Sequence, residues 1–224
     1  MPKAQQFEEA GYWVVTYPEE VRPLLHTKKA LARQAKKLRD VLRELGYHRG
    51  LQRWHYFGEQ SHKYHPHQNA LVEGGYLEPA QLERQKDIIR KALFSATLSH
   101  ATGKQLDIHY SYLKDPKQIF HKLKYITRAT FLDELWNEAL AHRLYRFRNC
   151  NTWGTWDSPA AWELPSQAEK LKPLLQLAEN RCPVCGTPLN WNKRLFPLVL
   201  VLLENPTEIA KGIYLLPPIP ERPP

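Results

Sequence analysis

The residues best suited to chemistry are histidines and an asparagine that lie close together in the chain. His65, His67 and Asn69 fall in a stretch of strand-forming residues, and His55 falls in another such stretch upstream. Side chains two residues apart in a strand share a face, so His67 and Asn69 are expected to point the same way. Imidazole nitrogens and an amide oxygen bind divalent metals and leave positions for substrate oxygens. We therefore expect His67, Asn69 and His55 to hold a metal.

A tyrosine among cations is the second chemical feature. Tyr125 has Lys122, Lys124 and Arg128 close by in the sequence, and such cations favour a phenolate or steer a phosphate. A tyrosine can act as a covalent nucleophile, although a tyrosine on a helix is more often a core residue. A metal that polarises a phosphate, together with an attacking tyrosine, would complete a DNA-nicking site. Spacing alone leaves both interpretations open.

The order of these motifs resembles the HUH endonucleases, which include rolling-circle replication initiators and related transposases. The resemblance rests on His-Pro-His-Gln-Asn at 65–69 and Lys-Tyr-Ile-Thr-Arg at 124–128, with similar flanks at 54–58 and 71–77, and it covers about residues 11–147. It implies a single-tyrosine enzyme that uses Mg²⁺ or Mn²⁺ to cut single-stranded or hairpin DNA. The product would be a 5′-phosphotyrosine and a free 3′-hydroxyl, in replication initiation or transposition.

The chain departs from the family pattern at two positions. Gln68 stands where the family has a hydrophobic residue, and Asn69 stands in place of the second histidine. The resemblance then implies a weaker or differently selective metal site, and His65 with His67 is the alternative ligand pair. Tyr110 and Tyr112 are lower-ranked nucleophiles. Two rival functions stay open: a non-catalytic nucleic-acid-binding module on the same fold, and a metal-dependent nuclease that uses water.

The cysteines suggest a second metal. Cys182 and Cys185 form a Cys-Pro-Val-Cys-Gly knuckle, which is typical of zinc sites. Cys150 is expected as the third ligand and His142 as the fourth, with Zn²⁺ in a structural role. The alternative is a knuckle without zinc, or three buried cysteines.

The expected elements follow a β-α-β-β-α-β-α order, which predicts an α+β fold. Its antiparallel sheet would be of split βαβ type, with the helices packed on one face. The order rests on strands at 11–17, 51–58, from about 67, and 106–113, and on helices at 18–45, 79–99, from 116, and 131–147. We expect a nicking domain at 1–147, a small zinc-binding module at 148–195, and an apolar segment with a proline-rich tail at 196–224.

Charge and hydropathy limit the classes of binding partner that we expect for this protein. The 224 residues carry a formal net charge of +9, which favours a polyanion such as nucleic acid. The basic residues expected to contact DNA lie on one face of the helix at 18–45, although a merely solvated face is equally consistent: Lys28, Lys29, Arg33, Lys36 and Lys37. No signal peptide is visible, and the longest apolar run, 196–203, is too short to span a bilayer. A cytoplasmic protein without membrane contact is expected.

Overall fold

The computed structural model describes residues 3–58, 63–128, 137–163, 173, 176–177, 179–189, 207–210 and 213–215. The chain divides into two compact units. We call Lys3–Glu163 the sheet unit, and Leu164–Pro224 with Met1–Pro2 the C-terminal unit. The boundary predicted near residue 148 therefore falls inside the sheet unit.

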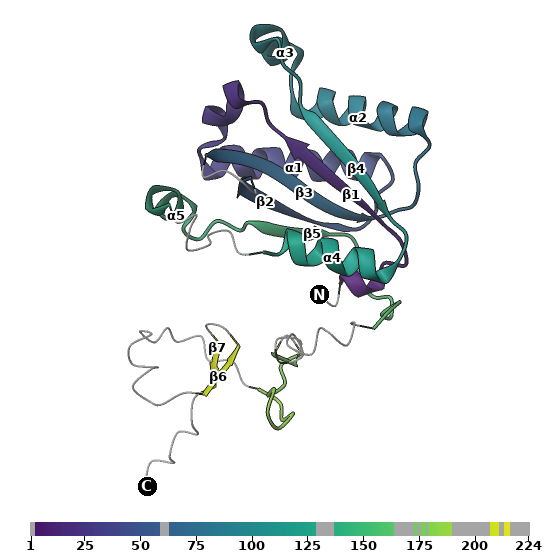
Figure 1. Ribbon diagram of the computed structural model, residues 1–224, viewed down its shortest axis with the longest axis vertical. Coiled ribbons are helices and arrows are strands. Elements are labelled where there is room, and N and C mark those ends of the chain that lie inside the picture. Colours follow the sequence, from purple (N-terminus) through teal and green to yellow (C-terminus); the bar gives the residue numbers. More distant parts are fainter. Residues whose placement is uncertain are drawn as a thin grey trace. The chain divides into compact units, whose positions relative to one another are not determined.

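The sheet unit is built on five strands in the order β4-β1-β3-β2-β5, and every neighbouring pair is antiparallel (Figure 1). Its strands are β1 (Ala10–Thr16), β2 (Gly50–Phe57), β3 (Tyr64–Glu73), β4 (Asp107–Leu113) and β5 (Cys150–Trp153). The predicted α+β fold with an antiparallel sheet is confirmed. The fifth strand was not predicted.

The helices follow the predicted order, with two interruptions. They are α1 (Lys28–Glu44), α2 (Pro79–Leu93), α3 (Ala96–Thr102), α4 (Pro116–Ile126) and α5 (Glu138–Leu144), with short 3-10 helices at Ala4–Gln6 and Glu19–Leu25. The helix predicted over 18–45 breaks at Thr27, whose Oγ1 accepts a hydrogen bond from the amide of Ala30 and so caps α1. Ser95 caps α3 in the same way, which divides the helix predicted over 79–99. Residues 131–136 of the last predicted helix lie outside the described residues.

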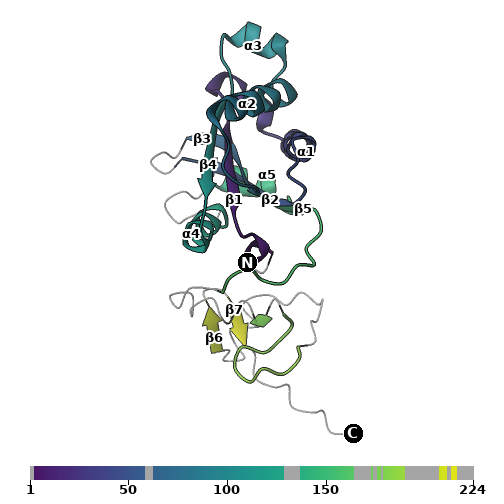
Figure 2. The same cartoon turned by 90° about the vertical axis from the view of Figure 1, so that its right-hand side faces the viewer.

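Helices cover both faces of the sheet, which corrects the prediction of one covered face. Trp13 and Val15 of β1 pack in one core with residues of α1 and α2, while α4 lies against the opposite face (Figure 2). The burial of β3 agrees with two covered faces, because residues 66–72 are all buried. A strand with one solvated face would alternate between buried and exposed residues.

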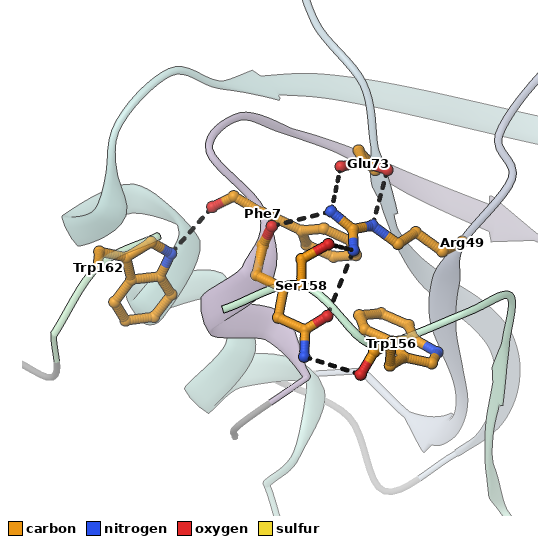
Figure 3. Close-up of polar contacts among 7 residues, drawn as sticks. Phe7, Arg49, Glu73, Trp156, Ser158 and Trp162 are labelled. Carbon is orange, nitrogen blue, oxygen red and sulfur yellow. Dashed lines mark hydrogen bonds and ion pairs between the residues drawn. The ribbon is translucent and has the colours of Figure 1, made fainter. Parts of the chain in front are cut away.

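One arginine ties the segment after β5 to the sheet (Figure 3). Arg49 Nε donates to Glu73 Oε2 at 2.7 Å, and its Nη1 donates to Ser158 Oγ at 3.1 Å. Its guanidinium lies over the rings of Phe7 and Trp156, and its side chain is 13 % exposed. The sheet unit therefore extends to Glu163 because residues 153–162 pack on its N-terminal segment.

Docking of β5 also depends on one glycine. Gly154 has φ +85°, and a Cβ there would collide with the carbonyl oxygen of His48. Only glycine tolerates both conditions without strain.

The described part of the C-terminal unit includes a two-stranded antiparallel hairpin, β6 (Thr207–Ala210) and β7 (Ile213–Leu215). These strands fall within the segment predicted as an apolar stretch and tail. The rest of 196–224 lies outside the described residues. No helix among the described residues has the length and apolar character needed to cross a bilayer.

Candidate active site

Two histidines face each other on the side of the sheet that α4 covers. His55 of β2 and His67 of β3 are direct cross-strand partners. Their ring centroids lie 5.3 Å apart with the rings nearly perpendicular. Asn69 follows two residues after His67 and is fully buried. The antiparallel pairing of β2 with β3 therefore brings together the three residues expected to bind metal.

Hydrogen bonds fix which nitrogens carry protons. His55 Nε2 lies 2.9 Å from the carbonyl oxygen of Ile126, and because a carbonyl only accepts, Nε2 must donate. Nδ1 of His55 then carries the lone pair; it is buried and has no hydrogen-bond partner among the described residues. In the same way, His67 Nδ1 donates to the carbonyl oxygen of His65 at 2.9 Å, so in the neutral ring Nε2 carries the lone pair.

Burial keeps His55 neutral. Desolvation lowers the pKa of His55 to about 3, against the hydrogen bond to Ile126, which acts to raise it; the charges of His67, Arg128 and Arg53 lower it further. A neutral imidazole is the form that binds a metal. At neutral pH the His55 ring is thus in its ligating state.

Asn69 has a partner that the sequence analysis missed. The hydroxyl of Tyr12 donates to Asn69 Oδ1 at 2.5 Å, and Asn69 Nδ2 is buried without a hydrogen-bond partner among the described residues. Turning the amide by 180° exchanges its oxygen and nitrogen, and Tyr12 would then accept instead of donate. In that orientation Asn69 would present its oxygen where a cation could meet it. The signal in the sequence was the alternation of β1, which places Tyr12 on the face opposite Trp13.

Tyr125 enters the same site from α4. Its ring centroid lies 5.3 Å from that of His55, and the Arg128 guanidinium lies 4.5 Å from the Tyr125 ring centroid. Arg53 of β2, another residue not predicted, donates to the carbonyl oxygen of Arg128 at 3.0 Å. The end of α4 is therefore held over the histidines by contacts from β2.

The remaining predicted catalytic residues do not all face this site. Lys122 Nζ lies 5.0 Å from the Tyr12 ring centroid and so borders it. Lys124 is exposed and lies over Phe120 instead. Tyr110 packs against Trp13 on the other face of the sheet, with ring centroids 4.6 Å apart.

His65 lies at the edge of this group of residues, next to His67. Its ring centroid is 5.7 Å from that of His67, and its buried Nε2 has no hydrogen-bond partner among the described residues. His65 therefore stays available as the alternative ligand.

Gln68 is a polar residue inside the sheet whose hydrogen-bonding groups are paired. It is buried on the α1 and α2 face, where its Nε2 donates to the hydroxyl of Tyr17 at 2.6 Å and its Oε1 accepts from Gln52. A buried amide is tolerated when its donors and acceptors are paired. The polar residue is thus stabilised by a local network on the face of the sheet opposite His67 and Asn69.

The side chains present suit a divalent cation, although they are not a full set of strong ligands. Across the described ranges, no group of three or more histidine, cysteine, aspartate or glutamate side chains is placed to hold a metal. The site offers two imidazoles, of which that of His55 is neutral, and one amide. Nδ1 of His55, buried with no hydrogen-bond partner in the part of the chain that the structure describes, is the observation that favours a bound cation, because buried polar atoms usually have partners.

The basic residues of α1 lie on the other side of the sheet from His55, His67 and Tyr125. All five predicted DNA-contacting residues are exposed, but α1 packs on the face of the sheet opposite α4 (Figure 2). Lys36 forms an ion pair with Asp40, and Lys28 donates to the carbonyl oxygen of Tyr145.

A hollow of about 420 Å³ does lie beside the site, between α4 and the edge strand β4. It is lined by Tyr112, Leu113, Lys117, Gln118, His121 and Lys122. Lys122 thus borders both the hollow and Tyr12.

The predicted zinc ligands are divided between the two units. Cys150 lies in β5 and His142 in α5 of the sheet unit, whereas Cys182 and Cys185 belong to the C-terminal unit. Around the knuckle, the amide of Gly186 donates to the Cys182 carbonyl at 2.8 Å. Hydrogen bonds with Thr187, and then with Cys182, lower the pKa of the Cys185 thiol. The four-ligand zinc site stays a prediction.

Comparisons of the chain with protein-family models, curated proteins and solved structures found no match.

Proposed function

We propose that the protein cuts one strand of DNA and rejoins it, with Tyr125 as the nucleophile. The observation that supports this most is the convergence of His55, His67, Asn69 and Tyr125 from β2, β3 and α4 on one covered face of the sheet. Two buried imidazoles lie beside a tyrosine whose ring an arginine covers, and phosphoryl transfer would give this arrangement a use.

The residues would divide the chemistry between them. His55, His67 and Asn69 would hold Mg²⁺ or Mn²⁺, which supplies Lewis-acid polarisation of phosphate oxygens. The Tyr125 oxygen would attack phosphorus as its proton leaves, and the bond from phosphorus to the 3′ oxygen would break, with that oxygen taking up a proton. Arg128, above the Tyr125 ring, would favour the phenolate and stabilise the added negative charge.

The products account for rejoining. The 5′ end stays on Tyr125 as a phosphodiester and the 3′-hydroxyl is free. The bond energy is conserved, so the reverse attack restores the strand. Such a reaction serves rolling-circle replication initiation or transposition on single-stranded or hairpin DNA.

The proposal is tested by incubating the protein with a pool of labelled single-stranded oligonucleotides and Mn²⁺. We expect wild type and Tyr145→Phe to nick, and Tyr125→Phe to fail by more than about a hundredfold. Tyr145 is a matched control because it is 64 % exposed. Nicking by Tyr125→Phe at the wild-type rate would exclude a tyrosine mechanism and favour a nuclease that activates water.

A second candidate function is a nucleic-acid-binding module that does not cut. The observation that favours it is the hydrogen bond from Tyr12 to Asn69 Oδ1, which occupies the oxygen expected to bind metal. Tight oligonucleotide binding without nicking, across many sequences and with Mg²⁺ or Mn²⁺, would support this function instead.

A further inference from the structure

The C-terminal unit contains two cysteines at a spacing typical of zinc ligands. Residues 164–224 contain Cys182 and Cys185 but no other cysteine and no histidine. Structural zinc takes four ligands, almost always cysteine and histidine. A structural zinc bound at these cysteines would therefore take its other two ligands from outside this unit.

The knuckle itself is formed. An antiparallel bridge pairs Arg181 with Pro188, the amide of Cys182 donates to the Thr187 carbonyl at 2.8 Å, and Gly186 takes φ +73°. The Cys185 sulfur lies 3.1 Å from the hydroxyl oxygen of Thr187, within the same turn. Such a tight turn presents two thiolates to one ion.

The tip of the knuckle is apolar and open to solvent. Val184, between the two cysteines, is 69 % exposed, and Cys185 is exposed as well. The knuckle is therefore accessible to ligands from another molecule.

We propose that the knuckles of two copies of this chain share one Zn²⁺ through four thiolates, from Cys182 and Cys185 of each copy. A two-fold axis through the ion makes the two half-sites equivalent and closes the assembly at a dimer. The two Val184 side chains would cover each other beside the ion. Cys150, by contrast, belongs to the β2–β5 ladder opposite Arg53, where it is half-buried. This inference does not depend on the proposed nicking activity.

The test measures mass in solution and zinc content of the full-length protein. We expect a dimer with one zinc per two chains, which EDTA converts to a zinc-free monomer and added Zn²⁺ restores. Cys182→Ser should be a zinc-free monomer, while Cys150→Ser and His142→Ala should dimerise like wild type. Val184→Glu, which keeps both ligands, should raise the dimer dissociation constant at least tenfold.

Replacing zinc with Co²⁺ tests the ligand set without any substitution. Four thiolates around cobalt give intense sulfur-to-metal charge-transfer absorption, and this band should appear with one Co²⁺ per two chains. A monomer with one zinc per chain, lost in Cys150→Ser, would overturn the shared site in favour of an internal one. A protein that binds no zinc would also overturn it.

Discussion

At the scale of single residues, the positions of protons and lone pairs decide what the site can bind. His55 donates through Nε2 and keeps its lone pair on a buried Nδ1. Asn69 is oriented by the hydroxyl of Tyr12. Partners of this kind fix the direction in which a ligand side chain points and tune its affinity for a metal.

Tyr12→Phe is predicted to lower the affinity for Mn²⁺ by about tenfold, because the Asn69 amide loses the hydrogen bond that orients it. Titration calorimetry measures the binding directly, without an activity assay. Tyr76→Phe, at a tyrosine that is 63 % exposed, is the control and should bind as wild type. Equal or tighter binding by Tyr12→Phe would mean that Asn69 is not a ligand, or that Tyr12 competes with the metal.

Part of the site follows from the sequence. The two-residue period of strands places His67 and Asn69 on one face, and antiparallel pairing of adjacent strands places His55 opposite. The contacts of Tyr12 and Arg53 could not be derived, because they depend on the register of β1 and on the path of α4 over β2. Lys124 was predicted to take part only because it adjoins Tyr125, whereas a helix turns neighbouring residues by about 100°.

At the scale of elements, the sheet separates two basic helices. α1, which carries exposed lysines and arginines, lies on one face of the sheet, and α4 lies on the other (Figure 2). Lys117, Lys122 and Tyr125 all belong to α4. A strand bound at Tyr125 would meet α4 first. To touch α1 as well, it would have to pass around an edge of the sheet.

Replacing Lys117 and Lys122 together with glutamine is therefore predicted to weaken binding of a short single-stranded oligonucleotide about tenfold. The slope of log affinity against log salt should fall by about 0.7 for each phosphate that the variant no longer neutralises. Fluorescence anisotropy over a salt series measures both quantities. The matched control replaces Lys29 and Lys37 of α1 with glutamine. A larger decrease in affinity for that variant would place the DNA on α1, as the sequence analysis predicted.

The order of the elements was predictable because each carries its own periodicity and its own stop signals. The faces they cover were harder to predict. The apolar stripe of α4 shows that it is covered, but not by which face of the sheet. The clue was β3, whose residues 66–72 include His67, Gln68 and Asn69 and are nonetheless all buried. Polar residues in a strand ordinarily indicate a solvated face, so the sequence favoured one.

At the scale of the whole sheet unit, Arg49 joins the N-terminal segment, the end of β3 and the chain after β5. Arg49→Met is predicted to lower the free energy of unfolding by about 2 kcal/mol, because it breaks hydrogen bonds to a charged group that is largely buried. Urea unfolding followed by circular dichroism measures this. Arg43→Met, at an exposed position on α1, should stay within about 0.5 kcal/mol of wild type. Equal effects of the two substitutions would contradict the role of Arg49.

Buried tyrosines should make the sheet unit sensitive to alkali. Burial raises the pKa of Tyr47 and Tyr64 to about 12, and it also raises the pKa of Tyr17, Tyr56 and Tyr110. Tyrosines in the unfolded chain ionise near pH 10. Their stabilising effect is thus complete below pH 10 and is lost as the pH rises through 12. Tyrosinate absorbance and loss of circular dichroism should therefore rise together in this range. Ionisation of these tyrosines near pH 10 in a still folded protein would contradict the burial.

Covalent joining of Tyr125 to DNA can be detected by mass spectrometry of the protein after reaction. A cut oligonucleotide would be left on the protein, the adduct digested with nuclease and protease, and the modified peptide sequenced. We expect a nucleotide 5′-phosphate on Tyr125, formed only with a divalent cation and absent from Tyr125→Phe. Nicked DNA with no adduct, or an adduct on another tyrosine, would contradict this expectation.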